Sequence, residues 1–270
     1  MAALADGNER TRSTGRRPRR FPDIAWAIFV LSLVLGGCQL PTFGERHPIT
    51  RQGVHTLKLW QGFFVTALCV GGLVMGLILY AAVRFRRRSE EIPSQTADKL
   101  WLEVVYTITP VLIVAVLFTV SVMTAHAVDD SGAHPALTVD VVGFQWGWQF
   151  SYPGRHISIT GTGVDHPPIL VLPRGETARL VLRTRDVNHS FWVPDFLEKR
   201  DLIEGVDNAI DVTPTRLGSY DGRCAEYCSL DHWRMTFILK VVTPQRFESE
   251  LAAAQRSANR AAAELSRPTS

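Results

Sequence analysis

Cysteine is scarce in this sequence, with four residues in a chain of 270. So low a count excludes the small secreted scaffolds that disulfides hold together. One of the four, Cys69, lies inside an apolar run, where we expect a buried thiol. Cys38 ends a leader-like segment, while Cys224 and Cys228 share one short loop. Each of these two places therefore needs its own explanation.

Excess charge of one sign is also missing. Lysine and arginine number 29 against 26 acidic residues, which gives a net charge of +3. A balance this even gives no reason to expect a nucleic-acid partner. The arginines gather instead beside apolar runs, within residues 10–20 and 84–88. Charges placed in this way indicate membrane topology rather than a ligand site.

The first apolar run, residues 24–35, is short for a membrane span. It follows a basic leader and fits the core of a signal peptide. It ends in Leu-Gly-Gly-Cys38, which resembles the lipobox of bacterial lipoproteins. That resemblance implies that residues 1–37 are cleaved off and that the Cys38 sulfur carries a diacylglycerol. The alternative is an uncleaved signal anchor with an incidental cysteine.

Two longer apolar runs, residues 63–83 and 104–125, carry no charge and are long enough to cross a bilayer as helices. The arginines between them place the connecting loop in the cytoplasm. Cys38 and everything after about residue 128 then lie outside the bacterial cytoplasmic membrane, in a multi-pass protein that contacts lipid. Glu103 lies at the cytoplasmic end of the second run. It is either an interfacial charge at a helix start or part of a proton path.

From about residue 137 the pattern changes to short runs rich in β-branched and aromatic residues, separated by glycine, proline and aspartate. The runs include residues 137–142, 178–184, 191–193, 219–223 and 235–242. They predict an antiparallel β domain of roughly 110 residues, either a sandwich or a barrel. Residues 244–265, rich in alanine, glutamate and arginine, predict one surface helix.

The segment from Cys224 to Met235 gathers metal-binding side chains. Cys228 lies four residues after Cys224, His232 four residues later, and Met235 three after that. On the outer side of the cytoplasmic membrane, two close cysteines can form a disulfide. A zinc ion is a second alternative, but it would need a further nitrogen or sulfur donor. Thiolate, imidazole and thioether together are typical of copper electron-transfer sites. Such a site needs one more histidine from elsewhere, and His189 is the best candidate.

A single-copper site of this kind needs one cysteine, so two cysteines allow a site with two copper ions. Two bridging thiolates would hold the ions close together, and His189 and His232 would bind one ion each. Met235 and the backbone carbonyl of Glu226 would be weak axial donors. One electron shared over two metals changes each bond little, which suits rapid electron transfer.

With these residues the sequence resembles subunit II of the bacterial haem–copper cytochrome c oxidases, which carries a dinuclear copper centre called CuA. The resemblance rests on His-Ser-Phe-Trp-Val-Pro from residue 189 and on Cys-x-Glu-x-Cys-x3-His-x2-Met from residue 224. It implies a membrane-anchored all-β protein, in which a two-helix transmembrane hairpin precedes a cupredoxin-like Greek-key β-barrel. Electrons would pass from cytochrome c to CuA and on to the haem–copper subunit I, which reduces oxygen to water. The family's CuA positions are present here as His189, Cys224, Glu226, Cys228, His232 and Met235.

The resemblance implies further roles. Trp146 matches the tryptophan through which electrons enter from cytochrome c, whereas Trp148 could simply pack the core. The carboxylate of Glu226 matches a ligand of a magnesium ion shared with subunit I. Glu103 matches a residue at the mouth of a proton channel, in a complex that translocates protons. Subunit III and membrane lipid are the other partners implied.

The acids that commonly follow the tryptophan motif, and that meet lysines of soluble cytochrome c, are absent. Residues 151–156 read Ser-Tyr-Pro-Gly-Arg-His, while Asp186 and Asp201 keep two acids for docking the donor. Because electrostatic steering mainly sets the association rate, we expect a weak encounter with a freely diffusing basic cytochrome c. A tethered donor needs less steering. The sequence therefore favours a membrane-anchored cytochrome c, or one within a bc-type complex.

Two other functions stay open at this point: the CuA subunit of a nitric oxide reductase, and a membrane-tethered copper chaperone. The chaperone fits less well because its thioredoxin-like βαβ pattern is missing, and a quinol-oxidising subunit II would lack the two loop cysteines. The expected boundaries are a signal peptide at 1–37, an outer segment at 38–59, a transmembrane hairpin at 60–127, a CuA domain at 128–243, and a helix and tail at 244–270.

Overall fold

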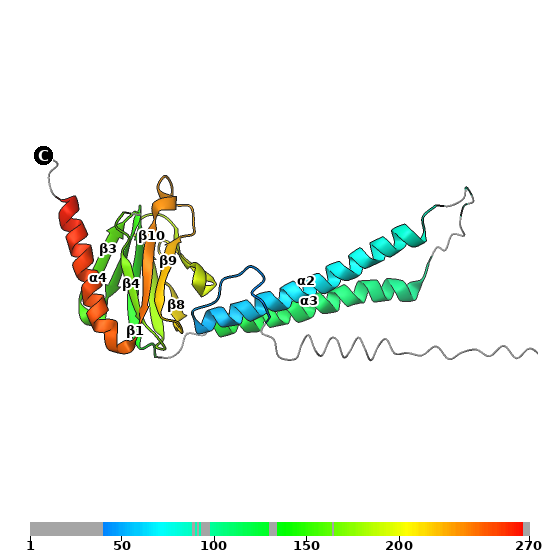
Figure 1. Cartoon of the computed structure of the whole chain (residues 1–270), viewed down its shortest axis with the longest axis horizontal. Helices are drawn as coiled ribbons and strands as arrows, with labels where there is room; N and C mark the ends of the chain where they lie inside the picture. Colours follow the sequence, from blue (N-terminus) through cyan, green and yellow to red (C-terminus); the bar gives the residue numbers. More distant parts are fainter. Residues whose placement is uncertain are drawn as a thin grey trace, which may run out of the picture. The chain divides into compact units, whose positions relative to one another are not determined.

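The computed structural model describes residues 40–87, 90, 92, 98–129, 134–163 and 165–266, and Cys38 lies outside them. Within these residues two long helices come first, α2 (Arg51–Arg84) and α3 (Leu100–Asp129). A β domain follows, and then a last helix, α4 (Pro244–Leu265). Figure 1 shows α2 and α3 side by side, and the two helices are in contact.

Length and apolar composition make α2 and α3 candidate membrane spans. The apolar runs at 63–83 and 104–125 lie inside these helices, and each helix extends beyond its run at both ends. Thr50 caps α2, since its side chain accepts a hydrogen bond from the Gly53 N–H at 3.0 Å. Cys69 is exposed on α2, so its expected burial is wrong. In the described part of the chain α3 is the one long helix that packs along α2.

The β domain consists of two five-stranded sheets, in the orders β3-β2-β1-β5-β8 and β4-β10-β9-β6-β7. The strands of the first sheet are β1 (Leu137–Phe144), β2 (Gly147–Tyr152), β3 (Ile157–Thr162), β5 (Ala178–Thr184) and β8 (Asn208–Val212). Those of the second are β4 (Ile169–Pro173), β6 (His189–Val193), β7 (Glu198–Leu202), β9 (Gly218–Cys224) and β10 (Thr236–Val242). Every run predicted as a strand overlaps one of these strands. The domain is thus a two-sheet sandwich behind two apolar helices.

The expectation of a purely antiparallel domain is wrong. β1 pairs with β5 in parallel, with Val139 opposite Leu180, and β10 pairs with β4 in parallel, with Leu239 opposite Leu170. The parallel pairs arise because the chain leaves the first sheet after β3, adds β4 to the second sheet and returns as β5. Alternation along a strand indicates which face is buried, but it does not give the direction of the neighbouring strand.

Alternate residues of the strands point between the sheets and form the core, as the burial pattern of β1 shows. Trp148, Phe191 and Phe237 meet there and are each at most 1% exposed. The ring centroids of Trp148 and Phe237 are 5.3 Å apart, and Phe237 stacks on Phe191 at 4.9 Å. The Trp148 indole N–H also donates to the carbonyl of Met235. The aromatic core therefore reaches the loop in which the metal-binding side chains are predicted.

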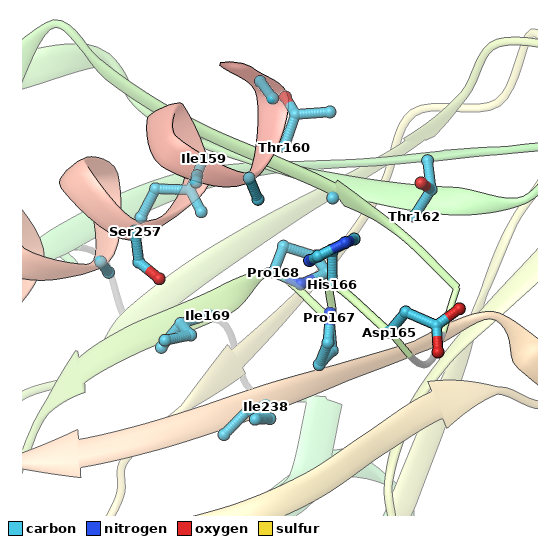
Figure 2. Close-up of a pocket in the computed structure, with 15 residues that line it drawn as sticks. Ile159, Thr160, Thr162, Asp165, His166, Pro167, Pro168, Ile169, Ile238 and Ser257 are labelled. Carbon is cyan, nitrogen blue, oxygen red and sulfur yellow. The ribbon is translucent and has the colours of Figure 1, made fainter. Parts of the chain in front are cut away.

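Helix α4 has the bounds expected from the sequence, and one of its faces packs on β3 and β4. Its buried residues include Phe247, Leu251 and Ala254. Farther along the helix, a cavity of about 410 Å³ separates α4 from β3, β4 and the loop between those strands. Figure 2 shows this cavity with Ser257 of α4 and the loop residues His166 and Pro167 around it. None of the predicted metal-binding residues lines it.

Candidate metal centre

The predicted metal-binding side chains lie where β6 begins and β9 ends. His189 is the first residue of β6, and Cys224 is the last residue of β9. The Cys224 N–H donates to the carbonyl of Met235 at 2.9 Å, and the Ala225 N–H donates to the carbonyl of Ser190 at 3.0 Å. These bonds close the base of residues 225–235, which we call the metal loop, and fix it to β6.

Two sulfur atoms and two imidazole nitrogens come together here. The sulfurs of Cys224 and Cys228 are 3.9 Å apart, and both residues are free cysteines. The two cysteines therefore do not form the disulfide that was the alternative to a metal site. Nδ1 of His189 lies 3.8 Å from the Cys224 sulfur, and Nδ1 of His232 lies 3.5 Å from the Cys228 sulfur. The ligand atoms of His189, Cys224 and Cys228 all lie within 4.8 Å of one another.

Two weaker donors adjoin this group. The Met235 sulfur lies 3.9 Å from the Cys228 sulfur, and the carbonyl of Glu226 accepts a hydrogen bond from the Cys224 thiol at 3.2 Å. His189, Cys224, Cys228 and Met235 are each at most 4% exposed. His232 is half-buried. Soft sulfur donors and imidazoles together suit copper and suit a hard cation poorly. The residues present therefore fit a copper site.

Asp186 fixes the orientation of His189. Its Oδ1 lies 2.8 Å from Nε2 of His189, and its Oδ2 accepts the backbone N–H of Gln145 at 2.8 Å. Burial opposes ionisation of this carboxyl, but hydrogen bonds from Gln145, His189 and Val187 outweigh burial and lower the pKa of Asp186. With Nε2 held by Asp186, His189 faces Cys224 with Nδ1, the nitrogen that would be unprotonated once a metal is bound there.

The two thiols differ in acidity before any metal binds. Burial raises the pKa of Cys224, but hydrogen bonds with His189 and with the backbone of Glu226 and Ser190 outweigh burial, and the net pKa is lowered. For Cys228, burial and the negative charge of Cys224 both act in one direction and raise the pKa to about 12. A metal that binds both sulfurs as thiolates has to displace the Cys228 proton.

The turn between β1 and β2 covers the Cys228 side of the cluster. Nε1 of Trp146 donates to the carbonyl of Cys228 at 2.9 Å, and Nε2 of Gln145 donates to the same carbonyl at 3.0 Å. The peptide bond between Gln145 and Trp146 is cis. Trp146 is half-buried, whereas Trp148 is fully buried and donates to the carbonyl of Met235 at 3.3 Å. Trp146 thus extends from the surface of the domain to the backbone of Cys228, while Trp148 packs in the core.

The other predicted residues are not part of this cluster. Glu226 is an exposed residue, although its carbonyl faces Cys224. Asp201 is half-buried in β7, opposite Ser190. Glu103 lies in the first turn of α3. At a rise of 1.5 Å per residue it is about 39 Å along that helix from Asp129.

Two contacts of the site are not expected from the sequence. Gln145 stands beside Trp146 in the motif, but a glutamine in a turn carries no signal of what its side chain will bind. Asp186 is expected from the sequence to dock the donor, whereas the structure also bonds it to His189. Its position three residues before that histidine is the one signal that could have indicated the contact.

Two family models match the chain. "Cytochrome C oxidase subunit II, periplasmic domain" matches residues 160–242, and "Cytochrome C oxidase subunit II, transmembrane domain" matches residues 50–123. The solved periplasmic domain of subunit II of cytochrome oxidase from Bradyrhizobium japonicum is 26% identical, covers 46% of this chain and 97% of that domain, and has a TM-score of 0.43.

Relatives of full length match as well. Proteins described as probable cytochrome c oxidase subunit 2 from Streptomyces avermitilis and Streptomyces coelicolor are 39% and 40% identical to this chain over 280 residues. Each match covers 87% of this chain and 88% of the relative. The cytochrome c oxidase subunit 2 of Mycobacterium tuberculosis is 28% identical over 304 residues, covering 89% of this chain and 84% of the relative. With such identity over most of both Streptomyces proteins, the chain belongs to the cytochrome c oxidase subunit II family.

Proposed function

We propose that this chain is the subunit of a terminal cytochrome c oxidase that accepts electrons from cytochrome c and passes them to the haem–copper subunit I, where oxygen is reduced to water. The observation that carries the proposal is the convergence of two buried free thiols, a buried thioether and two imidazole nitrogens, of which that of His189 is buried and that of His232 belongs to a half-buried residue. The family matches name cytochrome c oxidase and give no support to the nitric oxide reductase or copper chaperone alternatives.

The cluster is proposed to hold the dinuclear copper centre CuA. The proposed ligands are His189, Cys224, the carbonyl of Glu226, Cys228, His232 and Met235. The two cysteines would bridge the ions, each histidine would bind one ion, and the thioether and carbonyl would be weak donors. When bound, such a copper pair takes up and releases one electron with little change in its bonds.

The chain's own residues would prepare the site for electron transfer. Burial of His189, Cys224, Cys228 and Met235 keeps water from these donors, so that less solvent has to rearrange when the charge changes. Asp186 holds His189 in one orientation, and the core tryptophan Trp148 holds the backbone of Met235. Trp146, hydrogen-bonded to the carbonyl of Cys228, is our proposal for the residue through which electrons enter.

Further partners follow from the same proposal. The exposed carboxylate of Glu226 would bind a magnesium ion at the contact with subunit I, because Mg²⁺ prefers oxygen ligands and often takes few of them from one chain. Glu103 would lie at the mouth of a proton channel in subunit I. Subunit III would complete the complex, and Asp186 and Asp201 would contact the electron donor.

The chain is anchored to the membrane by its apolar helices, with the β domain outside. We propose that α2 and α3 both cross the bacterial cytoplasmic membrane, so that the protein is multi-pass, with its hairpin within residues 60–127. The signal peptide would be residues 1–37, the outer segment 38–59, the CuA domain 128–243 and the terminal helix and tail 244–270. Cys38 would carry the lipid.

Copper analysis of the full-length chain, purified in detergent and loaded with copper, tests the proposal. We expect two copper ions per chain and an electron spin resonance spectrum with hyperfine splitting from two equivalent nuclei. Cys228→Ser removes one bridging thiolate and should abolish the two-copper site, whereas Cys69→Ser, on α2, should keep it. One copper in the wild type, or an unchanged spectrum in Cys228→Ser, would show that the ligand assignment is wrong.

A further inference from the structure

We propose that Gln145 is a positioning residue of the metal centre, which holds the backbone of Cys228 in the conformation that metal binding needs. The inference rests on the proposed copper site and concerns a residue that is not one of its ligands. Nε2 of Gln145 and Nε1 of Trp146 donate to the Cys228 carbonyl at 3.0 and 2.9 Å. Because a carbonyl oxygen has two lone pairs, these two bonds use its full capacity.

Cys228 lies in a stretch with few other backbone contacts. Backbone bonds to the rest of the domain are made at the ends of the metal loop, by Cys224 and Ala225. Inside the loop, the described N–H groups of His232, Arg234 and Met235 bond only to earlier residues of the same loop. The bonds from the β1–β2 turn to Cys228 therefore tie this loop to the sandwich, together with the ion pair of Arg234 and Asp165 at 2.9 Å nearer the end of the loop.

The peptide after Cys228 also needs to be held. Ser229 has a φ of +86°, in a region that residues with side chains rarely adopt and that costs about 1–3 kcal/mol. The φ angle of Ser229 depends on the orientation of the peptide plane that contains the Cys228 carbonyl. Two hydrogen bonds on that carbonyl fix the plane, and with it the direction in which the Cys228 side chain leaves the backbone.

Gln145 reaches the other side of the cluster through its backbone. Its N–H donates to Oδ2 of Asp186 at 2.8 Å, and Oδ1 of Asp186 lies 2.8 Å from Nε2 of His189. One residue thus holds a cysteine through its side chain and a histidine through a carboxylate. The separation of the two sides of the cluster is thus set from the two-residue turn that joins the paired strands β1 and β2.

The test measures how fast copper leaves the full-length, copper-loaded chain when a strong chelator is added. The spectrum and reduction potential are recorded on the same samples. Gln145→Leu removes the carboxamide but keeps the backbone N–H that Asp186 accepts. Losing a residue that orients a metal ligand typically lowers metal affinity about 10- to 100-fold. We therefore expect copper loss to be at least about 10-fold faster, with an altered hyperfine splitting. Gln145→Glu keeps the shape of the side chain, but an ionised carboxylate cannot donate a hydrogen bond. This variant should therefore lose copper at least as fast as Gln145→Leu.

Gln149→Leu is the matched control. Gln149 lies in β2 of the same hairpin, and its carboxamide donates to Ser151 and Ser158 rather than to the metal loop. This variant should keep the wild-type rate, spectrum and potential. Trp146→Phe removes the second donor, and combining it with Gln145→Leu should accelerate copper loss by more than the product of the two single effects, because the carbonyl then has neither bond.

Wild-type rate, spectrum and potential in Gln145→Leu would overturn the inference. A wild-type result for Gln145→Glu would also do so, because shape rather than hydrogen bonding would then suffice. Equal acceleration in Gln145→Leu and Gln149→Leu would assign the effect to the hairpin as a whole and would contradict it too. Failure of the proposed function is distinguishable, since the wild-type chain would then bind fewer than two coppers.

Discussion

Nε2 of His189 lies 2.8 Å from Oδ1 of Asp186, and this contact leaves Nδ1 facing the Cys224 sulfur at 3.8 Å. Asp186→Asn keeps the side-chain shape but replaces a charged acceptor with a neutral amide. We expect copper affinity to fall about 10-fold or more, as is usual when the partner of a ligating histidine is lost. The reduction potential should rise, because a nearby negative charge favours the more positive oxidised site. Chelator competition and a redox titration measure the two effects.

Asp207→Asn is the control for that change. The Asp207 side chain is 93% exposed, and its contact with Arg183 is long, at 3.8 Å. Affinity and potential should both stay at their wild-type values in this variant. If Asp186→Asn leaves them unchanged as well and raises only the KM for the electron donor, Asp186 acts in docking and does not position His189.

Met235→Leu removes the thioether and keeps a buried apolar side chain of similar volume. Met235 is fully buried, with its sulfur 3.9 Å from that of Cys228. Volume-conserving swaps usually cost less than about 1.5 kcal/mol, so the domain should fold. We expect two coppers at a higher reduction potential, since a weak donor to the oxidised site is lost. Redox titration beside Met123→Leu, on α3, measures the shift; an unchanged or lower potential would argue against Met235 as a ligand.

Gly222 in β9 lies against the ring of Phe237. A Cβ at Gly222 would come within 2.1 Å of that ring, and Phe237 is itself packed against Phe191 and Trp148. Gly222→Ala should therefore destabilise the domain by about 1–3 kcal/mol, the usual cost of overpacking. Thermal unfolding of the purified chain, followed by tryptophan fluorescence, measures the loss.

Gly154→Ala serves as the comparison, because nothing lies within 4 Å of the Cβ that it adds. It should unfold at the wild-type temperature. If Gly222→Ala also unfolds at the wild-type temperature, the ring of Phe237 can shift to accept the added methyl group, and the prediction of overpacking is wrong.

The elements of this chain were predictable where the signal is local. An uncharged run such as 63–83 indicates a span by its length alone, and the run 178–184 is strand β5 with its bounds unchanged. The pairing of β1 with β5 was not predictable, because it depends on the chain crossing between sheets. The helical extension of α2 back to Arg51 was also missed, since its first turns are polar and owe their start to the Thr50 cap.

The candidate site likewise has a part that the sequence predicts and a part that it does not. Cys224, Cys228, His232 and Met235 lie within one short segment, so their chemistry could be recognised without a fold. Gln145 was not predictable, because its partner lies 83 residues away and is a backbone carbonyl, which every residue type has. Contacts of this kind follow from sheet register, which the sequence specifies only through the packing of the whole domain.

The charges of the β domain lead to a prediction about the electron donor. The carboxylate of Asp186 is hydrogen-bonded to His189 and to the backbone N–H of Gln145. Asp140 forms an ion pair with Arg183 at 3.4 Å. Arg155, in the segment after β2, forms one with Glu248 at 2.7 Å. The arginines neutralise Asp140 and Glu248, and the negative charge of Asp186 is directed towards His189 and the Gln145 N–H, so these acids attract lysines of a soluble cytochrome c only weakly. The intact oxidase should therefore oxidise a soluble basic cytochrome c slowly, with a rate that changes little as salt is added.

A cytochrome c domain tethered to the membrane should be oxidised faster at the same total concentration, because the tether raises its effective concentration without needing attraction. Initial rates for the two donors over a range of ionic strength make the comparison. Steering acts on association rather than on the electron-transfer step, so the donors should differ in kcat/KM while kcat stays similar. Fast oxidation of the soluble donor that falls steeply with salt would mean that acids such as Asp201 steer it after all, and the case for a tethered donor would be lost.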